Sequence, residues 1–145
     1  MTDLSFQARH QVSLTVAAMG GGHDPLKALG ALTQLRAAVT RAERDAARRA
    51  REDGRTWHDI GEALGFKGLS GFPWTSVAER AFLATASDLG SGPVVAWECP
   101  VCGGMVTDRG PETGHPADAE EGHRGSCARL TATVKAWNAQ WEGSE

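Results

Sequence analysis

The chain has 145 residues, 41% of them hydrophobic, and a formal net charge of −3. This length suits one ordinary domain or two small ones, and no apolar run approaches the ~20 residues that a membrane-spanning helix needs. An acidic total also argues against nucleic-acid binding by the chain as a whole, but residues 1–96 carry 11 Lys/Arg and 10 Asp/Glu, whereas residues 97–145 carry 4 and 8. Any binding to a polyanion is therefore expected from the first part.

Residues 1–24 form an N-terminal segment whose structure the sequence leaves open. Its start lacks the basic and apolar stretches of a signal peptide, which predicts a cytoplasmic protein without a membrane anchor. Phe6, Val12, Leu14 and Val16 fit a short helix or a short strand equally well. Three consecutive glycines at 20–22 then predict a flexible joint.

A long helix is predicted from Asp24-Pro25, where Asp caps the free N–H groups and Pro suits the first helical position, to Gly54. Its length would be about 40 Å. Apolar residues recur at steps of three and four and form one stripe: Leu26, Leu29, Leu32, Leu35, Val39, Ala42, Ala46 and Ala50. Five arginines fall on the other faces: Arg41, Arg44, Arg48, Arg49 and Arg51. They are either a solvated helix surface or a flank that contacts phosphates.

Two shorter helices follow. Thr56 and Asp59 form a capping box that opens the first, which Gly65 ends. Trp57, Ile60 and Leu64 share one face of it.

A second capping box, Ser76 with Glu79, predicts a helix to about Ala86. We expect Val77, Ala81 and Ala84 to face the core there, and Arg80 to face outward.

The segment Arg55-Thr-Trp-His-Asp-Ile-Gly-Glu-Ala-Leu-Gly65 resembles the first half of the helix-turn-helix found in actinobacterial and sigma-factor-like DNA-binding proteins. The resemblance implies a helix-turn-helix domain over residues 25–89. The positions that it places at DNA are Arg55 and Lys67 at phosphates, and Thr75, Ser76, Glu79 and Arg80 at the recognition helix. The sequence departs from the family because that helix begins some ten residues after Gly65 rather than three or four. A plain three-helix bundle without a DNA partner is the alternative.

Residues 90–96 read as a linker, and residues 97–145 as a small module with a metal site. The spacing Cys99-x2-Cys102 and His123-x3-Cys127 supplies four thiolate and imidazole ligands in two close pairs, which is typical of structural zinc. We therefore expect one Zn²⁺ ion. The alternatives are a Cys99–Cys102 disulfide, three unrelated buried cysteines, or His115 replacing His123 as the ligand.

The rest of this module is predicted as a short strand at 94–97, a loop over 107–121 and a helix from His123 onward. That helix would carry Cys127, Leu130, Val134, Trp137 and Trp141 on one side, with both tryptophans in the core. Residues 97–142 resemble C2HC zinc modules of small actinobacterial or phage-type proteins. The predicted fold class is mainly α: a helix-turn-helix domain followed by a zinc-stapled module with a short β turn and a helix.

The function predicted from these features is a small DNA-binding regulator, with double-stranded DNA as partner, a structural zinc ion and a homodimeric arrangement. The alternative is a protein-interaction adaptor that uses the zinc module and the Trp-bearing helix. No Ser/His/Asp grouping, phosphate-binding glycine loop or open metal position is recognisable, so we expect no enzymatic activity.

Overall fold

The structure is a computed structural model that describes residues 4–66, 76–88 and 90–142. The chain divides into two compact units, Met1–Ala42 and Glu43–Glu145, and the boundary falls within a long helix. Within the described ranges helices predominate and accompany one small antiparallel sheet, which confirms the mainly α class.

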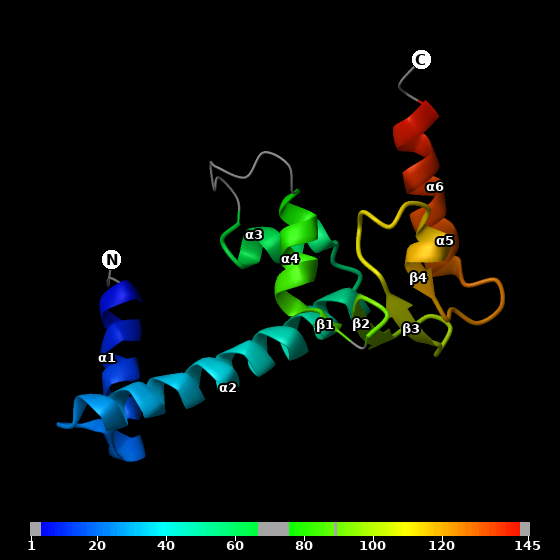
Figure 1. The fold of residues 1–145 in the computed structure, drawn as a ribbon. Helices are drawn as coiled ribbons and strands as arrows, with labels where there is room; N and C mark the ends of the chain where they lie inside the picture. The colour runs from blue at the N-terminus through cyan, green and yellow to red at the C-terminus, as the bar shows by residue number, and fades with distance from the viewer. Residues whose placement is uncertain (1–3, 67–75, 89, 143–145) are drawn as a thin grey trace. The chain divides into compact units, whose positions relative to one another are not determined.

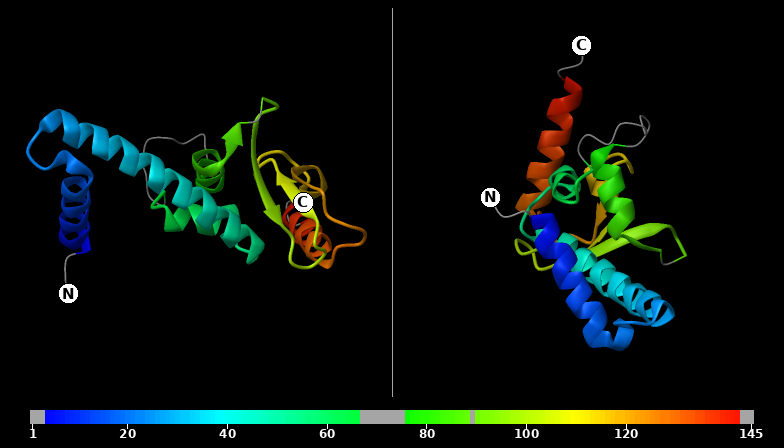
Figure 2. Two further views of the ribbon diagram at one scale, coloured as in Figure 1. Left: turned by 90° about the horizontal axis from the view of Figure 1, so that it is seen from below. Right: turned by 90° about the vertical axis from the view of Figure 1, so that its left-hand side faces the viewer.

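The first unit consists of α1 (Leu4–Val16), a π-helical stretch (Ala17–Gly21) and the first part of α2. Gly20, with a φ of 87°, bends the chain where the sequence predicts a joint. Figure 2 shows that α1 and α2 meet at this bend and then diverge. Among the described residues of this unit, only Gly21 and Ala31 are buried.

The long helix α2 covers Pro25–Glu52 (Figure 1), close to the predicted limits. The Asp24 carboxylate accepts a hydrogen bond from the Leu26 N–H at 2.9 Å and so caps it, as predicted. The last turns of α2 belong to the second unit, where Ala47 is buried. Arg51 is buried too, at 8% exposure, so the prediction that it lies on an outer helix face is wrong.

The helices α3 (Trp57–Ala63) and α4 (Val77–Thr85) pack directly against each other. They approach most closely at Gly61, where a Cβ atom would lie 2.6 Å from the side chain and the carbonyl oxygen of Val77. The capping box of Thr56 and Asp59 is present with both of its hydrogen bonds. In α3, Trp57 and Ile60 are buried, as the shared face predicts.

The buried face of α4 consists of Ala81, Phe82 and Thr85, whereas Ala84 is exposed. The core-facing side of α4 is therefore rotated relative to the predicted one, because Phe82 and Thr85 reach the core and Ala84 does not. Ser76 caps the helix by accepting from the Glu79 N–H at 3.0 Å. The Glu79 carboxylate turns to the backbone of Glu112 instead of completing the box.

The sheet has the order β1-β2-β3-β4 and is antiparallel throughout. Its strands are β1 (Ser87–Asp88), β2 (Pro93–Glu98), β3 (Met105–Asp108) and β4 (Glu120–Glu121). The predicted strand at 94–97 is thus confirmed within β2. The predicted linker 90–96 and loop 107–121 differ from the structure, since they contain parts of β2, β3 and β4 together with the short helix α5 (Pro116–Ala119).

The core of the second unit is one cluster that joins the helices to the sheet. It includes Trp57 and Phe82, whose rings meet edge to face at 5.3 Å, and continues into the strands through Trp97 and Val106. Cys99 and Cys127 lie in the same cluster. Two of the four predicted metal ligands are therefore part of the main core of this unit.

The last helix, α6, covers Ala128–Glu142 and packs against α5 (Figure 1). It begins after Cys127, so the prediction that one helix carries both His123 and Cys127 is wrong: Gly125, with a φ of 54°, lies in a turn between them. Trp137 is half-buried and Trp141 is 64% exposed, so Trp141 is not a core residue. No helix in the described ranges is both long and apolar enough to cross a bilayer.

Candidate metal centre

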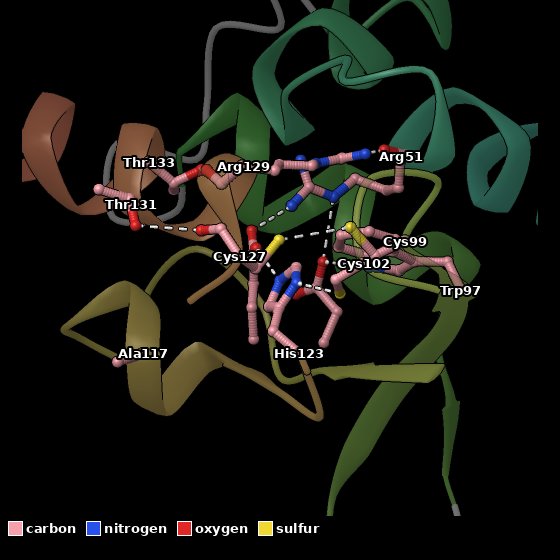
Figure 3. Close-up of polar contacts among 12 residues, drawn as sticks. Arg51, Trp97, Cys99, Cys102, Ala117, His123, Cys127, Arg129, Thr131 and Thr133 are labelled. Atoms are coloured by element: carbon pink, nitrogen blue, oxygen red, sulfur yellow. Dashed lines mark hydrogen bonds and ion pairs between the residues drawn. The ribbon is translucent and has the colours of Figure 1, made fainter. Parts of the chain in front are cut away.

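Four side chains converge at one end of the sheet: Cys99, Cys102, His123 and Cys127 (Figure 3). Their ligand atoms all lie within 4.8 Å of one another, and each residue offers one atom. The group could hold one metal ion. It is the set of four that the sequence spacing predicts.

The first two ligands belong to a turn that follows β2. The Cys99 N–H donates to the Gly104 carbonyl at 2.9 Å, and the Gly103 N–H donates to the Cys99 carbonyl at 2.7 Å. Gly104 also lets the second ligand loop come close, because a Cβ there would lie 2.4 Å from the Gly122 carbonyl oxygen. The two loops therefore meet backbone to backbone, which brings both ligand pairs together.

Two of the separations between ligand atoms match the edges of a tetrahedral zinc site. Zn–S bonds of ~2.3 Å and Zn–N bonds of ~2.0–2.1 Å give a tetrahedron with S–S edges of about 3.8 Å and S–N edges of about 3.6 Å. The Sγ atoms of Cys99 and Cys127 are 3.8 Å apart, and Cys102 Sγ lies 3.6 Å from His123 Nδ1. Both distances match the edges.

The backbone favours thiolate at Cys102. The Arg124 N–H donates to Cys102 Sγ at 3.3 Å, and this contact, with that of Gly104, lowers the pKa of Cys102 to about 6. Cys99 is fully buried, and desolvation raises the pKa of its thiol. A bound cation would reverse that penalty, because only the thiolate is a metal ligand.

The geometry disfavours the three alternatives to this ligand set, and the clustering of the three sulfur atoms already shows that the cysteines are not unrelated. All three cysteines are described, and none forms a disulfide. His115 caps α5 instead: its Nδ1 accepts from the Ala117 N–H at 3.1 Å, and its ring packs on Trp137 at 5.0 Å. His123 is thus the histidine of the cluster.

A second layer of contacts fixes His123. With Nδ1 facing the sulfur atoms, its Nε2 faces Glu120 Oε2 at 3.3 Å and can donate a proton to it. Metal-bound histidines commonly donate their other ring N–H to a carboxylate in this way, which sets the tautomer and the orientation of the ring. Glu120 in turn accepts a hydrogen bond from Arg51.

Arg51, Asp108 and Glu120 form a buried charge network that reaches His123 through Glu120. Asp108 Oδ2 accepts from Arg51 Nε at 3.0 Å and from the indole N–H groups of Trp57 and Trp97 at 3.0 and 3.1 Å. The network therefore connects α2, α3 and three strands of the sheet to a metal ligand.

Arg129, at the start of α6, closes the arrangement. Its guanidinium lies 4.3 Å from the Trp97 ring centroid and donates to the carbonyl groups of Arg51 and Glu52, the latter at 2.7 Å. These are carbonyls of the last turn of α2, where a cation is favourable. The contacts fasten α6, and with it Cys127, to the end of α2.

The positions of the residues predicted to contact DNA favour that role less clearly than the metal cluster favours an ion. Arg55 is exposed at the start of α3 and Arg80 is half-buried, while Lys67 and Thr75 lie outside the described residues. The Ser76 hydroxyl donates to Glu112 Oε1 at 3.2 Å, so a carboxylate lies beside the predicted recognition helix. Burial and the neighbouring Glu112 also raise the pKa of Glu79.

The sequence reasoning missed the charge network altogether. Arg51 is one of several arginines on a charged helix, and Asp108 and Glu120 lie in a polar stretch that reads as loop. The one available signal is the position of Glu120, three residues before the predicted metal-binding histidine.

No protein-family model, curated protein or solved structure matches the chain.

Proposed function

We propose that the protein is a small DNA-binding regulator whose second unit is stabilised by one structural Zn²⁺ ion at Cys99, Cys102, His123 and Cys127. The observation that carries the DNA proposal is the α3–α4 pair, two N-capped helices in close contact at Gly61. An arginine-bearing helix, α2, precedes this pair directly. Such a pair presents its second helix to the major groove in helix-turn-helix proteins.

Zinc is the ion that the donor set favours. Three thiolates and one imidazole suit a tetrahedral zinc site, and four protein donors leave no open position for water or substrate. A closed site of this kind holds structure together rather than performing chemistry. Its ligands come from two loops that are 20 residues apart in the chain, so the ion would crosslink β2 to the start of α6.

In this proposal Arg55 contacts a phosphate, because it is exposed at the N-terminus of α3, while Ser76 and Arg80 approach the bases from α4. Lys67 and Thr75 are the further contacts that the resemblance implies. Ser76 would have to exchange its hydrogen bond to Glu112 for one to DNA. A dimer would double the contact area and match a two-fold symmetric site.

The test is fluorescence anisotropy of the zinc-loaded protein with a mixed-sequence duplex over a range of salt concentrations. We expect Arg55→Gln to weaken binding severalfold and to reduce the slope of log K against log salt by about 1. Lys135→Gln, which removes one exposed positive charge from α6, is the matched control and leaves both unchanged. Wild-type protein that binds no duplex at low salt contradicts the proposal.

A second candidate is a protein-interaction adaptor, and the charge distribution favours it. Residues 43–145 carry eleven Lys/Arg and sixteen Asp/Glu, which gives a net charge of −5. In addition, the Ser76 hydroxyl already donates a hydrogen bond to Glu112. Trp141 on α6 is 64% exposed, and exposed tryptophan often anchors protein contacts. The adaptor is selected if the purified protein binds no DNA but retains a defined partner protein. That retention should require Trp141 and should not require Lys135.

A further inference from the structure

The first unit exposes apolar side chains that its own two helices do not cover. Eight large apolar residues are between 38% and 78% exposed: Phe6, Val12, Leu14, Met19, Leu26, Leu29, Leu32 and Val39. On α2, Leu29, Leu32 and Val39 recur at steps of three and seven and so lie along one stripe. The helices diverge after the bend (Figure 2), and among the described residues of this first unit only Gly21 and Ala31 are buried.

Such a unit is not expected to be stable on its own. An isolated helix shorter than ~12–15 residues is marginal in water, and most helical stability in proteins comes from packing of an apolar face. Helix α1 has 13 residues, and its largest apolar side chain, Phe6, is 65% exposed. The apolar surface of α1 and the first turns of α2 therefore needs a partner.

The charge pattern of this surface is that of an interface. Residues 4–35 contain three charged side chains, Arg9, Asp24 and Lys27, whereas residues 36–66 contain seven arginines and six acids. Depletion of charge is the compositional mark of an interface core. Charged side chains become frequent from Arg41 onward, where α2 enters the second unit, so the interface is expected to end near Val39.

We propose that the exposed apolar surface of residues 4–39 is a homodimer interface, covered by the same surface of a second copy. The eight side chains expose on the order of 700 Å² per copy, close to the ~800 Å² per partner of a standard stable interface. Two copies contribute two α1 and two α2 segments, which can enclose one apolar core in the manner of a four-helix bundle. A symmetric pairing needs only one self-complementary surface.

Sedimentation velocity of the zinc-loaded full chain over a wide concentration range tests the proposal. We expect a species of twice 15.3 kDa that dissociates on dilution. Leu29→Asp places two charges in the interface and raises the dimer dissociation constant by at least about tenfold. Leu83→Asp is the matched control, because Leu83 is also an exposed helical leucine, at 51% against 60%, but lies on α4. Its dissociation constant should equal that of the wild type.

A monomeric wild type at every concentration overturns the proposal, as does a dimer that Leu83→Asp disrupts and Leu29→Asp does not. Hydrogen exchange of the wild type supplies a readout that needs no substitution. Dilution from dimer to monomer should accelerate exchange in residues 4–35 and leave the sheet unchanged. Faster exchange in the sheet alone would place the interface in the second unit and overturn the proposal by itself.

Discussion

Replacement of Asp108 by Asn tests whether the buried charge network holds the second unit together. Asp108 is 1% exposed and accepts four hydrogen bonds, from Arg51, Trp57, Trp97 and the Gly110 N–H. Asn has a similar shape, but its amide group has one oxygen and carries no charge. The substitution therefore leaves one donor facing another donor and removes one of the two carboxylates that neutralise Arg51.

The size of the effect follows from these contacts. Removing one partner of a buried ion pair costs ~3–5 kcal/mol, because the remaining charge is left buried. Glu120 still neutralises part of the Arg51 charge. We therefore expect the lower end, about 3 kcal/mol, which corresponds to a fall in Tm of roughly 10–20 °C for a unit of this size.

The assay is chemical and thermal unfolding in excess zinc, so that loss of metal does not dominate the result. Glu121→Gln is the control, since Glu121 in β4 pairs with Arg109 at 3.3 Å but is largely exposed, and an exposed pair contributes ~0–1 kcal/mol. An Asp108→Asn variant that loses no more free energy of unfolding than Glu121→Gln refutes the role given to the network.

Three further outcomes are expected. Glu120→Gln should weaken zinc affinity by ~10–100-fold in a chelator competition, because His123 loses its orienting carboxylate; unchanged affinity contradicts this. Glu79→Gln should raise the Tm at pH 7, because the raised pKa means that the native state disfavours the carboxylate. The gain should shrink as the pH falls through the raised pKa of native Glu79 and vanish below the ordinary value of 4.5, because the side chain is then protonated in both the folded and the unfolded chain; a gain independent of pH refutes that cause. Glu112→Gln should strengthen duplex binding at low salt by removing an anion beside Ser76; weaker binding would count against α4 as the recognition helix.

The local rules of the sequence predict much of this fold. Asp24 and Thr56 are recognisable as helix caps because capping depends on side chains a few residues apart, and the four candidate metal ligands are recognisable because their spacing is local within each pair. The Val94–Trp97 strand was predictable because a short apolar run preceded the cysteine turn.

The remaining features depend on contacts between distant parts of the chain. Arg51 is buried because Asp108 and Glu120, 57 and 69 residues away, meet it, and no pattern within α2 signals that. The short strand β4 pairs with β3 over two residue pairs, too few to leave a periodic pattern. Gly125 turns the chain between His123 and Cys127 to meet the ligand geometry, whereas i, i+4 spacing by itself favours a helix.

Native mass spectrometry of the purified chain tests the central claim, that one tetrahedral ion crosslinks the loops of the second unit. We expect one zinc ion per chain, and for Cys127→Ser both loss of the ion and a fall in Tm, while Ser126→Ala, at the exposed neighbouring position, keeps the ion and the wild-type Tm. A wild-type chain that is free of metal and yet fully folded, with an unfolding transition unchanged by added zinc or chelator, would contradict it.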